Sequence, residues 1–148
     1  MGTKFFALIV AVMTGVCMVS LIPGAGAGDF DGSKPLYGVT GKIVEVNAFR
    51  ISENVDPDTL GIPEKFLIDF KAGVIRPSRD SLIKKTIAIQ RVAHVENNLV
   101  LQGVDTGVDG VDDDYAWSMT ISKKDGKAVL AASGRGVGYV AFGACAVR

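Results

Sequence analysis

Apolar and polar residues alternate along much of the chain, and this alternation predicts β-strands. Residues 115–122 give the clearest case, because large apolar side chains fall on one face and small or hydroxyl-bearing ones on the other. The apolar face holds Tyr115, Trp117, Met119 and Ile121. A period of two is typical of a strand with one buried face, since successive side chains point to opposite sides of the sheet.

Turn residues at short intervals separate these alternating segments. Asp125 and Gly126 form the strongest turn signal, Asn97 and Asn98 a second, and residues 72–73 a third. The pattern predicts eight strands, over residues 36–47, 65–71, 73–77, 82–95, 98–104, 115–122, 127–133 and 137–145. Short links favour an all-β, single antiparallel up-and-down meander. Such a meander closes into an eight-stranded lipocalin-like barrel, which removes its exposed edges, or folds as a β-sandwich.

Two long loops interrupt the pattern. Residues 52–64 contain two prolines and are expected to be irregular, with at most one helical turn around residues 59–62. Residues 105–114 are strongly acidic, and their carboxylates make a candidate calcium site. The candidate ligands are Asp105, Asp109, Asp112 and Asp114. The flanks are predicted strands and the closing acid of a calcium loop is missing, so a solvated hairpin tip is the simpler interpretation.

The first 27 residues predict a signal peptide. Lys4 precedes an apolar run over residues 5–22, Pro23 ends the run, and small residues up to Ala27 match a peptidase site. We expect a signal helix over this segment and a single β-domain over residues 28–148, in the periplasm or outside the cell. An uncleaved membrane anchor is the alternative, because the run has the minimum length for a spanning helix.

Charge and composition exclude several classes of function. Loss of Lys4 with the signal leaves 15 basic and 16 acidic side chains, which argues against a nucleic-acid partner. His94 is the only histidine, and Cys145 would be the only cysteine after residue 27. We expect Cys145 to be buried in an apolar strand. No acid–base or nucleophile constellation is evident, so the sequence predicts a protein that is not an enzyme and needs no cofactor.

Aromatic and sulfur-containing side chains on the inward strand faces suggest a binding cavity. The candidate ligand-binding residues are Tyr115, Trp117, Met119, Tyr139 and Phe142. The alternative is that these side chains simply fill the interior of a small barrel.

Several stretches resemble a group of small exported bacterial proteins of uncharacterised function. The matching elements are residues 66–71 (FLIDFK), 99–103 (LVLQG), 117–119 (WSM), the hairpin over 122–134, and 142–145 (FGAC). The resemblance implies an exported all-β protein, and it supplies no site residues.

These observations lead to two hypotheses about function. The first is an exported, non-enzymatic binding or accessory protein that holds a small apolar ligand or an envelope partner. The second is a structural or inhibitory envelope protein that acts by surface contact, through residues 52–64 and 105–114. An enzyme or a calcium-binding protein has the least support in the sequence.

Overall fold

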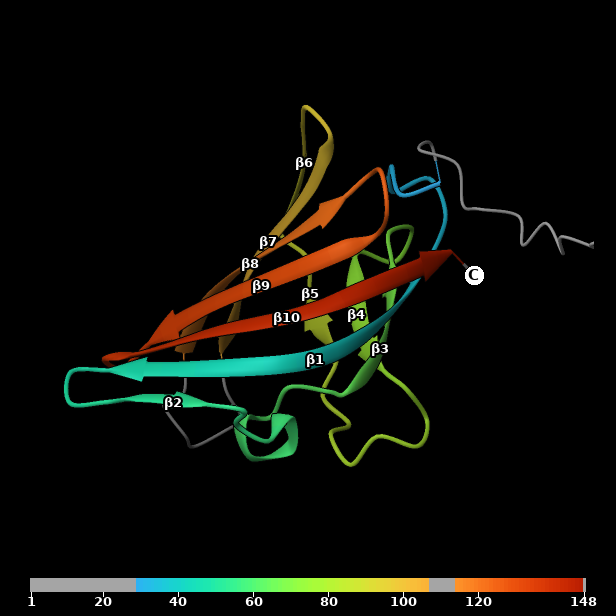
Figure 1. The fold of residues 1–148 in the computed structure, drawn as a ribbon. Helices are drawn as coiled ribbons and strands as arrows, with labels where there is room; N and C mark the ends of the chain where they lie inside the picture. The colour runs from blue at the N-terminus through green and yellow to red at the C-terminus, as the bar shows by residue number, and fades with distance from the viewer. Residues whose placement is uncertain (1–28, 107–113, 148) are drawn as a thin grey trace, which may run out of the picture.

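The computed structural model describes residues 29–106 and 114–147, and nearly all of its regular structure is antiparallel β-sheet (Figure 1). A single 3-10 helix, η1 (Pro57–Leu60), lies between the second and third strands of the described chain. The strands are β1 (Leu36–Asn47), β2 (Ile51–Glu53), β3 (Lys65–Asp69), β4 (Val74–Pro77), β5 (Ile87–Ala88), β6 (Arg91–Val95), β7 (Asn98–Thr106), β8 (Asp114–Ser122), β9 (Lys127–Gly134) and β10 (Val137–Val147).

The strands form one curled sheet in the order β5-β4-β3-β1-β10-β9-β8-β7-β6, with β2 paired to β1. The first long strand therefore lies beside the last, and Leu36 is opposite Val147. From β6 to β10 each strand pairs with the next along the chain. This arrangement confirms the predicted all-β antiparallel meander. The sheet curls into a half-barrel (Figure 1).

The prediction of one continuous strand over residues 82–95 is wrong. The segment contains two short strands, and they pair with opposite edges of the sheet: β5 with β4, and β6 with β7. Between them the Ile89 N–H donates to the Gly73 carbonyl at 2.8 Å, and the Gln90 N–H donates to the Gln102 carbonyl at 2.9 Å. The chain thus crosses from one edge of the half-barrel to the other, so it cannot stay in register with either edge along its whole length.

The hairpin turns lie close to where the sequence placed them. At the β8–β9 turn the Gly126 N–H donates to the Ser122 carbonyl at 2.9 Å, and Gly126 has a φ of +70°. The β6–β7 turn is formed by Glu96 and Asn97, one residue earlier than predicted, because Asn98 already pairs with Val95. The predictions also missed β2, which folds back on β1 just after it.

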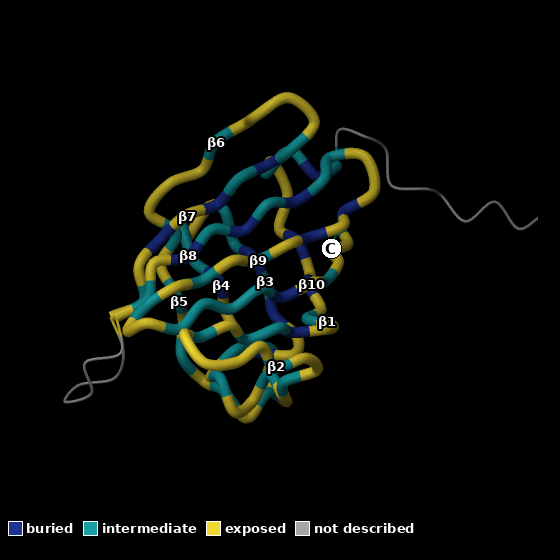
Figure 2. The backbone as a smooth tube through the Cα atoms, turned by 60° about the vertical axis from the view of Figure 1, so that its left-hand side comes forward, coloured by how far each residue is buried: buried dark blue, intermediate teal, exposed yellow. Residues whose placement is uncertain are grey.

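The core occupies the concave face of the sheet, and buried positions alternate with exposed ones along the strands (Figure 2). Among the described residues, six aliphatic side chains are completely buried: Leu36, Ile43, Ile68, Leu99, Leu101 and Ile121. Cys145 joins this core, which confirms its predicted burial. Phe30, from the segment before β1, is also in the core with only 3% of its surface exposed.

The predicted signal peptide, residues 1–27, lies outside the described residues, and the signal helix stays a prediction. Over residues 29–106 and 114–147, no helix has both the length and the apolar character needed to cross a membrane.

Candidate functional site

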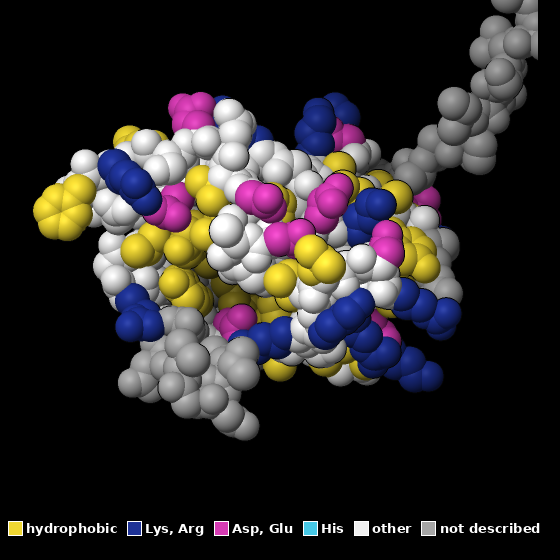
Figure 3. Space-filling view, turned by 90° about the horizontal axis from the view of Figure 1, so that it is seen from below, with side chains coloured by type: hydrophobic (Ala, Val, Ile, Leu, Met, Phe, Trp, Pro, Cys, Tyr) yellow, Lys and Arg dark blue, Asp and Glu magenta, His cyan; other side chains and the backbone are white. Residues whose placement is uncertain are grey.

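The concave face of the sheet encloses a cavity of about 110 Å³. Figure 3 shows its opening as a hollow lined by hydrophobic side chains. Strands β1, β3, β4, β5 and β7 to β10 contribute to its walls, together with the last residue of η1 and the three residues that follow it. The lining comprises Val39, Thr40, Leu60, Gly61, Ile62, Pro63, Phe66, Ile75, Ile87, Asp105, Tyr115, Trp117, Met119, Ala128, Leu130, Ala132, Tyr139, Ala141, Phe142 and Gly143.

The five predicted ligand-binding residues all border this one cavity. Trp117 and Met119 project from β8 and are almost completely buried. The Tyr115 and Tyr139 rings lie side by side, with centroids 5.7 Å apart and planes inclined by 51°. Ala132 on β9 lies between Trp117 and Tyr139 in the sheet, because these two residues are its register partners on β8 and β10.

The expectation that Phe142 faces inward is wrong. It is 45% exposed, and in the alternation of β10 it lies on the face opposite to the buried Ala141 and Cys145. Its register partner Val129 is also exposed. The sequence predicted the wrong face because both neighbours of Phe142 are small, and a large aromatic residue between small ones is expected to face inward.

Leu60 of η1 and the three residues that follow it form one wall of the cavity. Asp56 caps the start of the helix, and its carboxylate accepts a hydrogen bond from the Asp58 N–H at 3.0 Å. Gly61 caps the other end in the left-handed conformation. The Thr40 hydroxyl then donates to the Pro63 carbonyl at 2.9 Å and ties this segment to β1. The predicted single helical turn is therefore present, two residues earlier than expected, and it belongs to the cavity.

One ion pair lies at the edge of the cavity. Asp105 pairs with Lys85, which reaches it from the irregular segment between β4 and β5. Among the described residues that line the cavity, Asp105 alone carries a charge. The remaining lining polar groups are hydroxyls of Thr40, Tyr115 and Tyr139, the indole of Trp117, and main-chain atoms.

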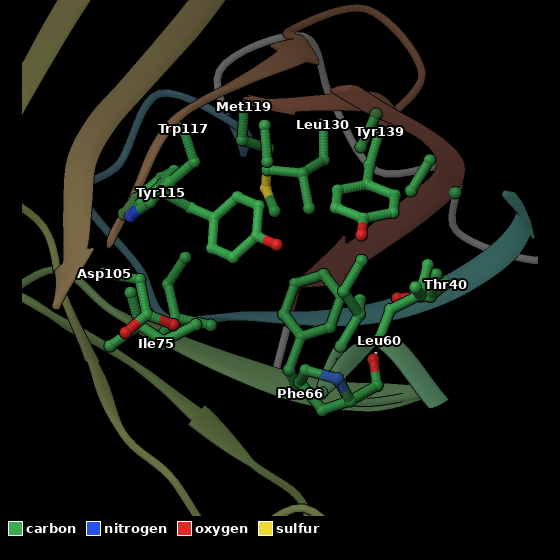
Figure 4. A pocket seen from close by; sticks show the side chains of 18 of the residues that line it. Thr40, Leu60, Phe66, Ile75, Asp105, Tyr115, Trp117, Met119, Leu130 and Tyr139 are labelled. Atoms are coloured by element: carbon green, nitrogen blue, oxygen red, sulfur yellow. Dashed lines mark hydrogen bonds between the residues drawn. The ribbon is translucent and has the colours of Figure 1, made fainter. Parts of the chain in front are cut away.

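The close view in Figure 4 shows how the two tyrosines lie. Their rings come from opposite sides, Tyr115 from β8 and Tyr139 from β10, and both hydroxyls point toward the middle of the cavity above Phe66. The Trp117 nitrogen lies on the Asp105 side. This nitrogen is fully buried and has no hydrogen-bond partner within the described part of the chain.

Two of the four candidate calcium ligands, Asp109 and Asp112, lie outside the described residues. Asp105 is ion-paired with Lys85, and Asp114 is exposed at the start of β8. In residues 29–106 and 114–147, His, Cys, Asp and Glu nowhere form a group of three suited to a metal ion.

The only histidine and the described cysteine do not have the surroundings of a catalytic pair. His94 is exposed on β6, at the end of the sheet order, whereas Cys145 is buried on β10 beside β1. Burial raises the pKa of the Cys145 thiol to about 12. A reactive cysteine needs its thiolate form near neutral pH, so this thiol is a packing group.

No family model matches the chain, and neither the curated proteins nor the solved structures include a match to it. The resemblance to small exported bacterial proteins therefore stays a prediction.

Proposed function

We propose that this protein is an exported, non-enzymatic binding protein that holds a small apolar ligand in the cavity of its curled sheet. The observation that supports this most strongly is a cavity bordered by aromatic, aliphatic and thioether side chains and open to solvent. Burial of apolar surface is worth about 25 cal/mol per Å², so such walls favour apolar molecules. The proposed export rests on the sequence pattern of residues 1–27.

The size of the cavity suits a molecule with one ring. Apolar cavities of roughly 150 Å³ hold benzene, and this cavity of about 110 Å³ is of the same order. Its opening to solvent leaves room for a substituent to extend outward.

The chemistry of the lining favours binding over catalysis. Among the described residues, the lining contains one carboxylate, which Lys85 neutralises, and it contains neither His94 nor Cys145. General acid–base or nucleophilic catalysis needs a titratable group within hydrogen-bond reach of the substrate and matched to the working pH.

The surface-contact hypothesis receives less support. One of its two contact elements, residues 52–64, contributes Leu60, Ile62 and Pro63 to the cavity wall. A segment that encloses a cavity and is tied to β1 is a less suitable free contact loop.

Binding of ethylbenzene to two variants tests the proposal. Ala132→Leu adds three carbons between the Trp117 and Tyr139 positions and fills the cavity. Ala131→Leu makes the same change on the exposed outer face of β9 and serves as the control. We expect ethylbenzene to raise the thermal unfolding midpoint of the wild type and of Ala131→Leu, because a ligand that binds the folded state stabilises it.

In Ala132→Leu we expect affinity to fall by about tenfold or more, since the ligand would have to displace a packed side chain. Circular dichroism of each variant without ligand checks that the sheet is intact. A wild type that gains no stability from ethylbenzene and other neutral one-ring compounds would overturn the proposal, and so would equal binding by both variants.

A further inference from the structure

We propose that the ligand is a neutral one-ring molecule with a single hydrogen-bonding oxygen, which the Tyr115 hydroxyl contacts inside the cavity. This inference rests on the proposed function and names the chemical class of the ligand. It is carried by three observations: the charge balance of the lining, the direction of the tyrosine hydroxyls, and the cavity volume.

Charge balance argues for a neutral ligand. Asp105 is the one charged residue among the described lining, and Lys85 pairs with it at the edge. An anion would meet the Asp105 carboxylate without a cation in the lining to offset it. A cation would have to compete with Lys85. Because transfer of an uncompensated charge into an apolar site is costly, a neutral molecule is favoured.

The tyrosine hydroxyls argue for one polar group on the ligand. Figure 4 shows the Tyr115 hydroxyl pointing into the space above Phe66, toward which the Tyr139 hydroxyl also points. Phenylalanine would fill this position as well if the cavity needed only an apolar wall. Most of the side chains that border this space are apolar, so a ligand that fills it takes water away from the Tyr115 hydroxyl, and loss of water without a new hydrogen-bond partner is unfavourable. A ligand oxygen can be that partner.

The position of Tyr115 makes it accessible to such an oxygen. It lies opposite Asp105 across the β7–β8 pair, at the edge of the cavity, and it is half-buried. Trp117 and Met119, further along β8, are nearly fully buried and offer apolar surface for the ring. The ligand would therefore place its ring against Trp117 and Met119 and its oxygen toward Tyr115.

The test compares acetophenone with α-methylstyrene, which has a CH₂ group in place of the carbonyl oxygen and nearly the same shape. Dissociation constants are measured by ¹H–¹⁵N shift titration in the wild type, in Tyr115→Phe and in Tyr37→Phe. Tyr37 is 45% exposed and is not among the cavity residues, so its variant controls for loss of a tyrosine hydroxyl elsewhere. For each ligand, the dissociation constant of a variant is divided by that of the wild type. The difference in hydration between the two ligands cancels in this ratio.

We expect Tyr115→Phe to weaken acetophenone binding by about fivefold, the usual net value of one hydrogen bond, and to change α-methylstyrene binding by less than twofold. Tyr37→Phe should change neither. Equal effects of Tyr115→Phe on both ligands, or no effect on either, would overturn this inference and leave the proposed function intact. If neither ligand nor ethylbenzene binds the wild type, the proposed function itself fails.

Discussion

Gly103 and Trp117 lie directly opposite each other on β7 and β8, and the indole occupies the space that a side chain at position 103 would need. A Cβ atom on Gly103 would lie 2.7 Å from Cζ2 of Trp117 and 2.7 Å from the carbonyl oxygen of Ala88. Glycine at position 103 therefore allows two groups to lie close to the β7 backbone. One is the indole of Trp117 on β8, and the other is the main chain of β5 at Ala88.

We therefore expect Gly103→Ala to displace Trp117 and to destabilise the protein by about 1–3 kcal/mol, the usual cost of overpacking. The displacement should be visible in fluorescence, because Trp117 is the only tryptophan in the chain. Urea unfolding followed by tryptophan emission measures both effects.

Gly138→Ala is the matched control for this substitution. A Cβ at position 138 would meet its nearest atoms at 3.9 Å, which is an ordinary contact distance. Its stability should be unchanged or slightly raised, since alanine loses less conformational entropy in a strand than glycine. Equal destabilisation by both variants would show that Gly103 has no special packing role.

Phe30 should contribute strongly to stability although it precedes the first strand. It is 3% exposed, and its ring would lie 2.7 Å from a Cβ placed on Gly126, so it packs closely on the β8–β9 turn. Phe30→Ala should lower the free energy of unfolding by about 3–5 kcal/mol. Phe49→Ala, the same change at a side chain that is 96% exposed, should alter it by less than about 0.5 kcal/mol. A small effect of Phe30→Ala in chemical denaturation would contradict the packing described for it.

Stability should decline at alkaline pH in a way that depends on Cys145. Burial raises the pKa of this thiol to about 12 in the folded protein, against roughly 8.5 in an unfolded chain. Only the unfolded state then loses the proton between these values, so unfolding becomes easier as pH rises. The contribution is complete below about pH 8.5 and falls by up to about 1.4 kcal/mol per pH unit above it.

Cys145→Ala removes this titration while other alkaline groups still titrate. Urea unfolding at pH 7, 8.5, 9.5 and 10 should therefore show the stability difference between wild type and variant shrinking above pH 8.5. A difference that stays constant up to pH 10 would mean that the thiol is not held in its neutral form.

Local sequence signals are sufficient to predict most strands of the sheet. The alternation over β8 follows from one buried and one exposed face. Gly126 indicates the next turn, because that turn needs a residue with positive φ. The division of residues 82–95 into β5 and β6 was not visible, because it depends on partners in β4 and β7 that are remote in sequence. Phe30 was missed for a similar reason, since one aromatic residue in a short polar segment has no periodicity.

The candidate site was predictable only where it coincides with strand alternation. Trp117 and Met119 were found because a half-buried strand must point them inward. Phe142 also borders the cavity, but its side chain lies on the exposed face of β10, which its small neighbours concealed in the sequence. The wall after η1 and the pairing of Lys85 with Asp105 arise from irregular segments, whose paths are set by tertiary contacts rather than by a repeating pattern.

Ligand binding in the cavity is tested most directly by a crystal structure of the protein equilibrated with bromobenzene, with anomalous scattering used to locate the bromine. We expect an anomalous peak inside the cavity, beside Trp117 and Met119, and its loss in Ala132→Leu crystals treated in the same way. An empty cavity in crystals of the wild type at saturating bromobenzene, or bromine found only on the outer surface, would contradict the proposed ligand binding.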